Sequence, residues 1–148
     1  MMTGEFRAAL DEKGRLLIPT KLRSEITGDA VVVTKSVDGC LWMFTLSNWE
    51  VFSQSLQGSV GMFSQRDLMI QRRIIGSAME LDVDKAGRIG ISALQREFAG
   101  LTKDCLLVGL GNFVEIWDEA AYEAYTKATE DSFGPAVQSL NLSPWAKA

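Results

Sequence analysis

The feature that most constrains this chain is an internal repeat. The stretch "DEKGR", which starts at Asp11, returns as "DKAGR", which starts at Asp84, 73 positions later. The same offset aligns "DEKGRLLIPTKLRSEI" with "DKAGRIGISALQREFA" and places Phe44 over Trp117. A period this long in a chain of 148 residues predicts two copies of one supersecondary unit and not a solenoid of many short repeats.

Each copy opens with a predicted β-hairpin. Apolar residues alternate with other residues at Phe6, Ala8 and Leu10 in the first copy and at Met79, Leu81 and Val83 in the second. This period of two indicates strands with one buried face. The D-x-x-G that follows suits a tight turn, because Asp accepts hydrogen bonds from nearby backbone and Gly adopts conformations that other residues resist. The turn residues are Asp11 and Gly14, then Asp84 and Gly87, and Arg15 and Arg88 stand where the turns end.

The rest of each copy predicts a helix, two strands and a second helix. The first helix starts after Pro19 in one copy, and in the other Ser92 and Gln95 form a capping-box pattern. Two apolar stretches joined by "SVDG" or "GLGN" turns then predict strand pairs. We expect the closing helices to be capped by Ser47, in a box with Glu50, and by Asp118.

This order of elements predicts an α+β protein with short helices. We assign residues 1–58 to the first repeat, 59–76 to a connecting helix and 77–127 to the second repeat. Residues 128–148 show no regular period and are predicted to be a flexible tail, unless its apolar residues bind a partner. Those residues are Phe133, Leu140, Leu142 and Trp145.

The residue inventory argues against an enzyme and against a metal site. The chain has no histidine, which excludes Ser-His-Asp and Cys-His catalysis and histidine-ligated metals. Cys40 and Cys105 lie in apolar segments without zinc spacing, so we expect buried, reduced thiols. The segment "DVDKAG" resembles the start of a calcium loop, but Ala86 and Ala93 occupy ligand positions. We therefore expect no cofactor and no metal.

The charge is unevenly distributed. The net charge is −4, yet residues 1–28 carry +1 while residues 115–148 carry −4. Such a chain does not coat nucleic acid by bulk attraction, so any DNA contact must be local. Neither a membrane span nor the apolar region of a signal peptide is apparent, and we expect a cytoplasmic protein.

The two turns and the duplication resemble the MraZ family of transcriptional regulators. The hallmark is two D-x-x-x-R turns half a chain apart, here Asp11 to Arg15 and Asp84 to Arg88, and the likeness covers residues 3 to about 126. The family pattern usually has a bulky apolar residue where this chain has Gly90. The resemblance implies two tandem swapped-hairpin AbrB-like β-barrel repeats about a pseudo-twofold axis. It also implies homo-oligomeric rings that bind double-stranded DNA at short tandem repeats upstream of the bacterial division and cell-wall gene cluster, hence on the nucleoid.

The chemistry of the turns suits this function. A guanidinium can bond to O6 and N7 of guanine together, so we assign base contact first to Arg15 and second to Arg88. Lysines in the same turns, Lys13 and Lys85, suit phosphate contact. Basic residues that would widen the footprint are Arg7, Lys21 and Arg23. Linked sites raise avidity, so a ring facing repeats about one helical turn apart should bind several repeats far better than one.

Other interpretations stay open at this stage. A D-x-x-G-R turn is commonly a solvated hairpin, and Arg23 and Arg96 could brace Asp11 or Asp84 instead of touching DNA. Arg72 and Arg73 suit a solvent-exposed helix face or an interface. The non-DNA alternative is an oligomeric interaction module that binds a protein through its acidic C-terminal helix or apolar tail.

Overall fold

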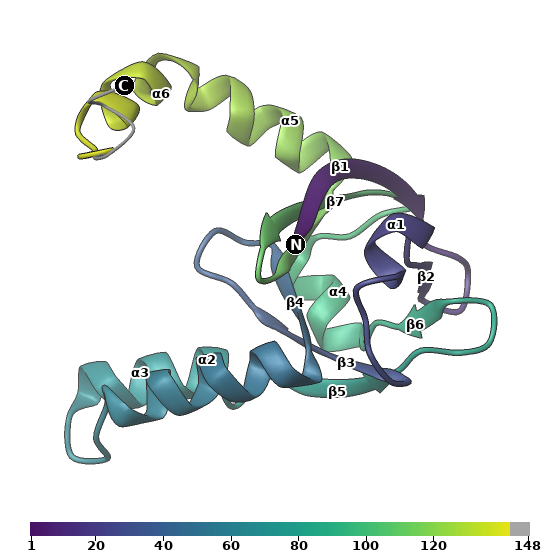
Figure 1. Cartoon of the computed structure of the whole chain (residues 1–148), viewed down its shortest axis with the longest axis horizontal. Coiled ribbons are helices and arrows are strands. Elements are labelled where there is room, and N and C mark those ends of the chain that lie inside the picture. The colour runs from purple at the N-terminus through teal and green to yellow at the C-terminus, as the bar shows by residue number, and fades with distance from the viewer. Residues whose placement is uncertain (143–148) are drawn as a thin grey trace.

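The structure, a computed structural model, describes residues 1–142. It is an α+β protein, as the sequence predicted, and it has a six-stranded antiparallel sheet and a separate two-stranded ribbon (Figure 1). The strands are β1 (Met2–Ala9), β2 (Arg15–Leu17), β3 (Ala30–Lys35), β4 (Leu41–Thr45), β5 (Met79–Asp82), β6 (Arg88–Gly90), β7 (Asp104–Gly111) and β8 (Val114–Asp118). The helices of the described residues are α1 (Thr20–Arg23), α2 (Leu46–Gly58), α3 (Gln65–Ile74), α4 (Ala93–Ala99), α5 (Glu119–Ala128) and α6 (Glu130–Gln138).

Strands of the two repeats interleave in the large sheet. β1 of the first copy pairs with β7 of the second over eight residue pairs, and β5 of the second pairs with β3 of the first over four. The strand order is β1-β7-β8-β4-β3-β5. Replacing every strand by its counterpart in the other copy gives the same order read backwards. The topology of the sheet therefore has pseudo-twofold symmetry.

The predicted hairpin pairing of β1 with β2 is wrong, although its turn is present. The N–H of Asp11 donates to the carbonyl of Arg15 at 2.9 Å, but only one isolated bridge, between Leu10 and Leu16, joins the two strands. Beyond it β2 pairs with its counterpart β6, and β5 likewise leaves β6 to pair with β3. The exchange gives β1 the long ladder with β7 and lets the short strands β2 and β6 cover the core together.

The main core lies between the ribbon and the sheet. The ribbon and the residues after it contribute Leu16, Ile18, Ile89 and Ile91, and the sheet contributes Val31, Val33, Leu41, Met43, Leu107, Val114 and Ile116. The predicted burial of both cysteines is confirmed: burial raises the pKa of the Cys40 thiol to about 12 and that of Cys105 to about 11. Both groups are therefore neutral thiols at pH 7.

Aromatic packing repeats with the same period as the turns. The rings of Phe44 and Trp49 lie 5.3 Å apart between centroids at the junction of β4 and α2. Their counterparts Trp117 and Tyr122 lie 5.3 Å apart at the junction of β8 and α5. The alignment of the two copies therefore extends from the turns to the second helix of each unit.

The helix caps agree with the sequence at most positions. Ser92 and Asp118 accept hydrogen bonds from the N–H of Gln95 and of Ala121, at 3.2 and 3.1 Å. The Gln95 side chain does not return to the cap, because it is buried and donates to the carbonyl of Val33 at 2.8 Å. The cap predicted at Ser47 is wrong. Thr45 caps α2 instead, so the helix begins two residues earlier.

Two helical arms leave the sheet. The first is α2 followed by α3, which is the predicted connecting helix with its N-cap at Ser64. The second is α5 followed by α6, where the sequence indicated an aperiodic tail. Glu130 and Asp131 in the first turn of α6 favour its start through the helix dipole, a signal that periodicity does not detect. Residues 143–148 of the predicted tail, with Trp145, lie outside the described residues, and the division into domains stays a prediction.

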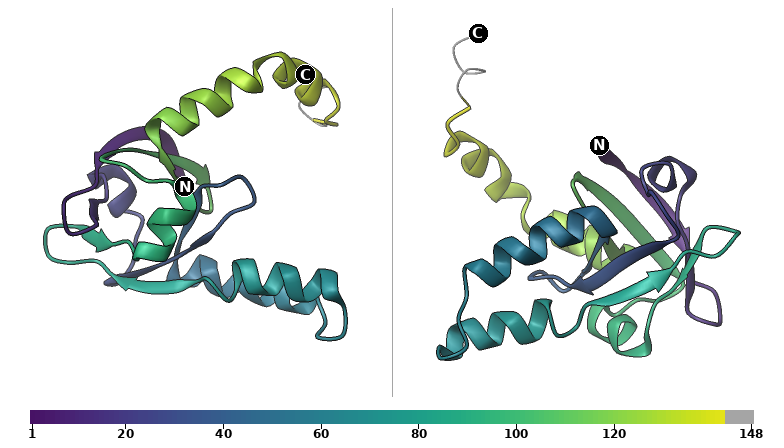
Figure 2. Two further views of the ribbon diagram at one scale, coloured as in Figure 1. Left: turned by 180° about the vertical axis from the view of Figure 1, so that it is seen from behind. Right: turned by 60° about the horizontal axis from the view of Figure 1, so that its bottom comes forward.

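Both arms extend from the side of the molecule opposite the two arginine turns (Figures 1 and 2). Within the described residues, no helix has the length and apolar character needed to cross a membrane.

Candidate nucleic-acid interface

Each turn is organised by its own aspartate. One carboxylate oxygen of Asp11, Oδ1, accepts from the backbone N–H of Lys13 at 2.9 Å and of Arg15 at 2.8 Å. Gly14 closes the loop with a bond from its N–H to the carbonyl of Asp11 at 3.0 Å, in the left-handed region at φ 77°. The second turn repeats this arrangement around Asp84, with the backbone of Ala86 and Arg88 and a glycine at φ 88°.

The second carboxylate oxygen of each aspartate holds the arginine that follows. Nε of Arg15 donates to Oδ2 of Asp11 at 2.8 Å, and Nε of Arg88 donates to Oδ2 of Asp84 at 3.0 Å. Hydrogen bonds from the backbone N–H of these arginines, aided by the guanidinium, hold the pKa of both carboxyls below the usual 3.8. Within residues 1–142, both guanidinium groups make their hydrogen bonds through Nε, so Nη1 and Nη2 are available to a ligand.

The arginines share one face of the β2–β6 ribbon. Arg15 lies opposite Gly90 and Leu17 opposite Arg88 in the antiparallel ladder. The residues between them, Leu16 and Ile89, are 0% exposed and face the core. Because side chains alternate along a strand, the other four face outward. We call Arg15, Leu17, Arg88 and Gly90 the ribbon face. Its two arginines are diagonal neighbours, and the Cα atoms of such neighbours lie about 7–8 Å apart.

Each turn is supported by an arginine from the other repeat. Arg23 donates to the carbonyls of Lys85 and Ala86 at 3.2 and 3.3 Å, beneath the second turn. A Cβ added at Gly87 would collide with the Arg23 guanidinium, and one at Gly14 would collide with that of Arg96. The two arginines are therefore braces, as one interpretation allowed. Neither contacts an aspartate, however: Arg23 bonds to the backbone of the opposite turn. Arg96 lies against Gly14 of the opposite turn and donates to the carbonyl of Ile91 in its own repeat.

The remaining predicted contacts differ in their position. Lys13 and Lys85 are exposed in the two turns, beside the ribbon face, and Lys21 is exposed on α1. Arg7 lies apart from them on β1, where it forms an ion pair with Glu119 at 3.0 Å. The structure thus brings together the turn lysines and arginines and leaves Arg7 outside this group.

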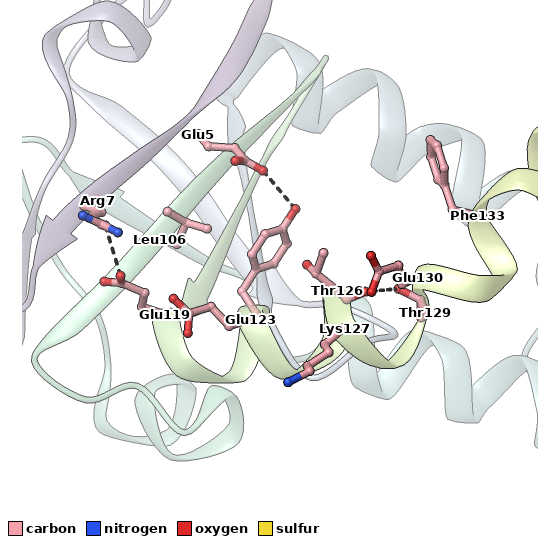
Figure 3. Close-up of a pocket in the computed structure, with 11 residues that line it drawn as sticks. Glu5, Arg7, Leu106, Glu119, Glu123, Thr126, Lys127, Thr129, Glu130 and Phe133 are labelled. Carbon is pink, nitrogen blue, oxygen red and sulfur yellow. Dashed lines mark hydrogen bonds and ion pairs between the residues drawn. The ribbon is translucent and has the colours of Figure 1, made fainter.

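Arg7 lies in a groove between β1, β7 and the second arm, with a volume of about 940 Å³. The hydroxyl of Tyr122 on α5 donates to Oε2 of Glu5 on β1 at 3.1 Å. Figure 3 shows Arg7 facing Glu119 within this groove. The lining is Glu5, Arg7, Leu106, Glu119, Tyr122, Glu123, Thr126, Lys127, Thr129, Glu130 and Phe133. Four carboxylates against two cations make this acidic groove unsuited to DNA.

Two members of the ribbon face were not predicted from the sequence as site residues. Leu17 is 50% exposed, and Gly90 is also exposed. The signal was available in the alternation after each turn, since positions two residues apart on a strand share a face. Arg15 therefore predicts the orientation of Leu17, and Arg88 predicts that of Gly90.

Comparison with known proteins agrees with the duplication. The family model described as MraZ protein matches residues 1–73 and again 74–141. The transcriptional regulator MraZ of Treponema denticola is 44% identical over 139 residues, which cover 94% of this chain and 96% of the relative. That of Symbiobacterium thermophilum is 43% identical over 94% of this chain and 99% of the relative. That of Treponema pallidum is 38% identical over 93% of each. Two matched repeats and relatives aligned over almost their whole length show that this chain belongs to the MraZ family.

Proposed function

We propose that this protein is a sequence-specific DNA-binding regulator of transcription. Its targets are short tandem repeats upstream of the division and cell-wall gene cluster, in the cytoplasm and on the nucleoid. The relatives named as transcriptional regulators support the general function. The observation that carries the proposal is the pair of aspartate-held arginines on the ribbon face. No catalytic role is part of it.

The geometry of the ribbon face suits the major groove. A two-stranded β-ribbon fits this groove, and guanine presents the acceptors O6 and N7 at its edge. Because each aspartate holds Nε, Arg15 and Arg88 keep their Nη groups for these acceptors. The aspartates thus restrict the arginines before DNA arrives and reduce the side-chain entropy lost on binding. Lys13 and Lys85, which flank the face, contact phosphates and position the protein.

The distribution of charge directs DNA to this side of the molecule. The two turns carry four cations against Asp11, Glu12 and Asp84. The acidic groove beside the second arm has four carboxylates against two cations. Long-range attraction is therefore weak, and specific binding depends on several small sites acting together. This requirement is met when copies of the chain form a ring over tandem repeats, which raises avidity by about 10² to 10⁴.

The fold and the arms support such an assembly. The interleaved sheet suits a swapped-hairpin AbrB-like barrel, a compact unit that presents both turns on one side. Phe63, in the loop between α2 and α3, is 98% exposed, and Phe133 of α6 is 72% exposed. Large apolar side chains exposed on both arms are typical of surfaces that bind another protein. We assign them to contacts between neighbouring copies.

The same exposed residues favour the second candidate, an interaction module that binds a different protein and no DNA. Salt distinguishes the two functions. Binding to DNA through arginine and lysine releases counterions, so its affinity falls steeply as salt rises. An apolar contact through Phe133 and its neighbours would change little over the same range.

The test is binding of labelled DNA from upstream of the gene cluster, carrying one repeat or several. We expect several repeats to bind at least tenfold more tightly than one. Arg15→Ala should weaken binding by about 5- to 150-fold, and Arg88→Ala should also weaken it. Lys35→Ala is the matched control, since Lys35 ends β3, outside the ribbon face, the turns and the arms, with its ammonium over the ring of Phe98. Equal binding by wild type and Arg15→Ala would refute the proposed function, and equal affinity for one and several repeats would refute the ring.

A further inference from the structure

The ribbon face is symmetric in its arginines and asymmetric in its other two residues. Arg15 and Arg88 are counterparts 73 positions apart, and so are Leu17 and Gly90. The pseudo-twofold therefore relates two identical guanidinium groups, but it relates an isobutyl side chain to a bare backbone. Leu17 lies directly opposite Arg88 in the ladder, whereas Gly90 lies directly opposite Arg15.

The fold itself does not require this asymmetry. Gly90 has no positive φ, and a Cβ built on it would meet no heavy atom within 4 Å. Leu17 is 50% exposed and stands outside the core formed by its neighbour Leu16. A Cβ would therefore fit at position 90, and the side chain at position 17 is not part of the core. The fold therefore does not determine which residues stand at these two positions, and a ligand that binds this face can account for the difference between them.

We infer that Leu17 reads the methyl group of a thymine next to the guanine contacted by Arg88, and that Gly90 leaves the matching position beside Arg15 unread. The inference rests on the proposed function. Thymine is the base that presents an apolar group in the major groove, where leucine finds no other apolar partner. Directly opposed residues have Cβ atoms about 4.5–5.5 Å apart, which lets Leu17 reach the base pair beside that of Arg88.

One consequence is that each subunit has a direction on DNA. A face with exact twofold symmetry would bind any site, palindromic or not, equally well in either orientation. A face with one leucine distinguishes the two orientations and suits repeats that all point the same way. The residue that sets the direction is Leu17, since the arginines alone are equivalent.

The test replaces thymine by uracil, which removes only the methyl group. The probe is the tightest-binding duplex that the wild-type protein selects from a random-sequence pool, with each thymine replaced in turn and affinity measured by fluorescence anisotropy. We expect uracil at one thymine, next to one guanine contact, to weaken wild-type binding about fourfold, as for one buried methyl group. Leu17→Gly should bind the thymine duplex correspondingly less tightly and lose the response to uracil.

A variant that makes the ribbon face symmetric provides the converse test. Gly90→Leu should acquire a second uracil-sensitive thymine when thymine is placed at the mirror-related position. If Leu17→Gly is less stable, Leu17→Ala gives the same comparison, because it also lacks the terminal methyl groups. A wild type that depends on Arg15 but responds to uracil nowhere would overturn this inference and leave the proposed function intact. A response to uracil that persists in Leu17→Gly would also overturn this inference and leave the proposed function intact. Failure to select any DNA would overturn both.

Discussion

At the scale of single residues, two aspartates hold both the turns and the arginines of the site in place. Asp11 and Asp84 each join the backbone of a turn to the side chain of the arginine that ends it. An ionised carboxylate accepts such bonds better than a neutral one. The order of the ribbon face therefore depends on the charge of two groups that never touch DNA in the proposed complex.

This dependence predicts an effect of acid. The pKa of Asp11 is lower in the folded protein than its usual 3.8, so its ionisation contributes stability above pH 3.8. That contribution is lost as the pH falls through the lower folded value. Asp11→Asn should therefore lower the unfolding temperature at pH 7, and the difference from wild type should shrink below pH 3.8. Thermal unfolding followed by circular dichroism measures both, and a difference independent of pH would contradict the assignment.

The glycines of the turns provide a second prediction at this scale. Gly14→Ala places a Cβ at positive φ and against the Arg96 guanidinium, so it should lower the free energy of unfolding by about 1–2 kcal/mol or more. Gly90→Ala is the control from the same ribbon, where a Cβ meets open space. We expect its effect to lie within about 0.5 kcal/mol. Chemical denaturation of the two variants makes the comparison, and equal losses would exclude the brace.

At the scale of elements, the notable feature is that neither repeat completes its own sheet. β1 depends on β7, β5 depends on β3, and β2 and β6 form the ribbon only together. The turns of one copy also rest on arginines of the other. The two halves are therefore expected to behave as one cooperative unit, although the chain between them passes through an exposed loop.

A cut in that loop tests the interleaving. A protease site inserted beside Met62 and Phe63, both exposed between α2 and α3, should be cleaved without separating the halves. The ladders between copies and the shared core hold them together until denaturant is added. Size-exclusion chromatography with mass spectrometry of the peak reports the outcome. An uncut protein carrying the same insertion is the control, and elution of two separate halves would show that the cross-pairing is weak.

The sequence predicted which face of a strand is buried better than it predicted which strand lies beside it. Alternation identified Phe6, Ala8 and Leu10 as one side of a strand, and all three pack on the core. It could not show that this strand pairs with β7, because periodicity contains no information about which strand lies alongside. For the site, the two D-x-x-G-R turns predicted the paired arginines. The crossing of Arg23 and Arg96 to opposite turns depends on that strand exchange and required the three-dimensional arrangement.

At the scale of the whole molecule, the two arms differ in charge. The first arm has Arg72 and Arg73 exposed on α3 and Phe63 exposed at its tip. The second arm covers the acidic groove, which is lined by carboxylates and by Tyr122 and Phe133. In the assembly that we propose, a contact between these two different surfaces is head-to-tail, and such contacts close into rings when the rotation allows.

A charge exchange tests whether these surfaces meet in the assembly. Arg72→Glu with Arg73→Glu should repel the acidic groove of a neighbouring copy and shift the protein to smaller species in light scattering at low salt. Lys103→Glu, a charge reversal outside the arms and the groove, should leave the size unchanged. Adding Glu123→Arg and Glu130→Arg to the first pair should restore the larger species, because attraction returns with the signs exchanged. If the variant with all four substitutions remains folded but still forms only the smaller species, the arms do not join through these charges. The ring must then form through another surface.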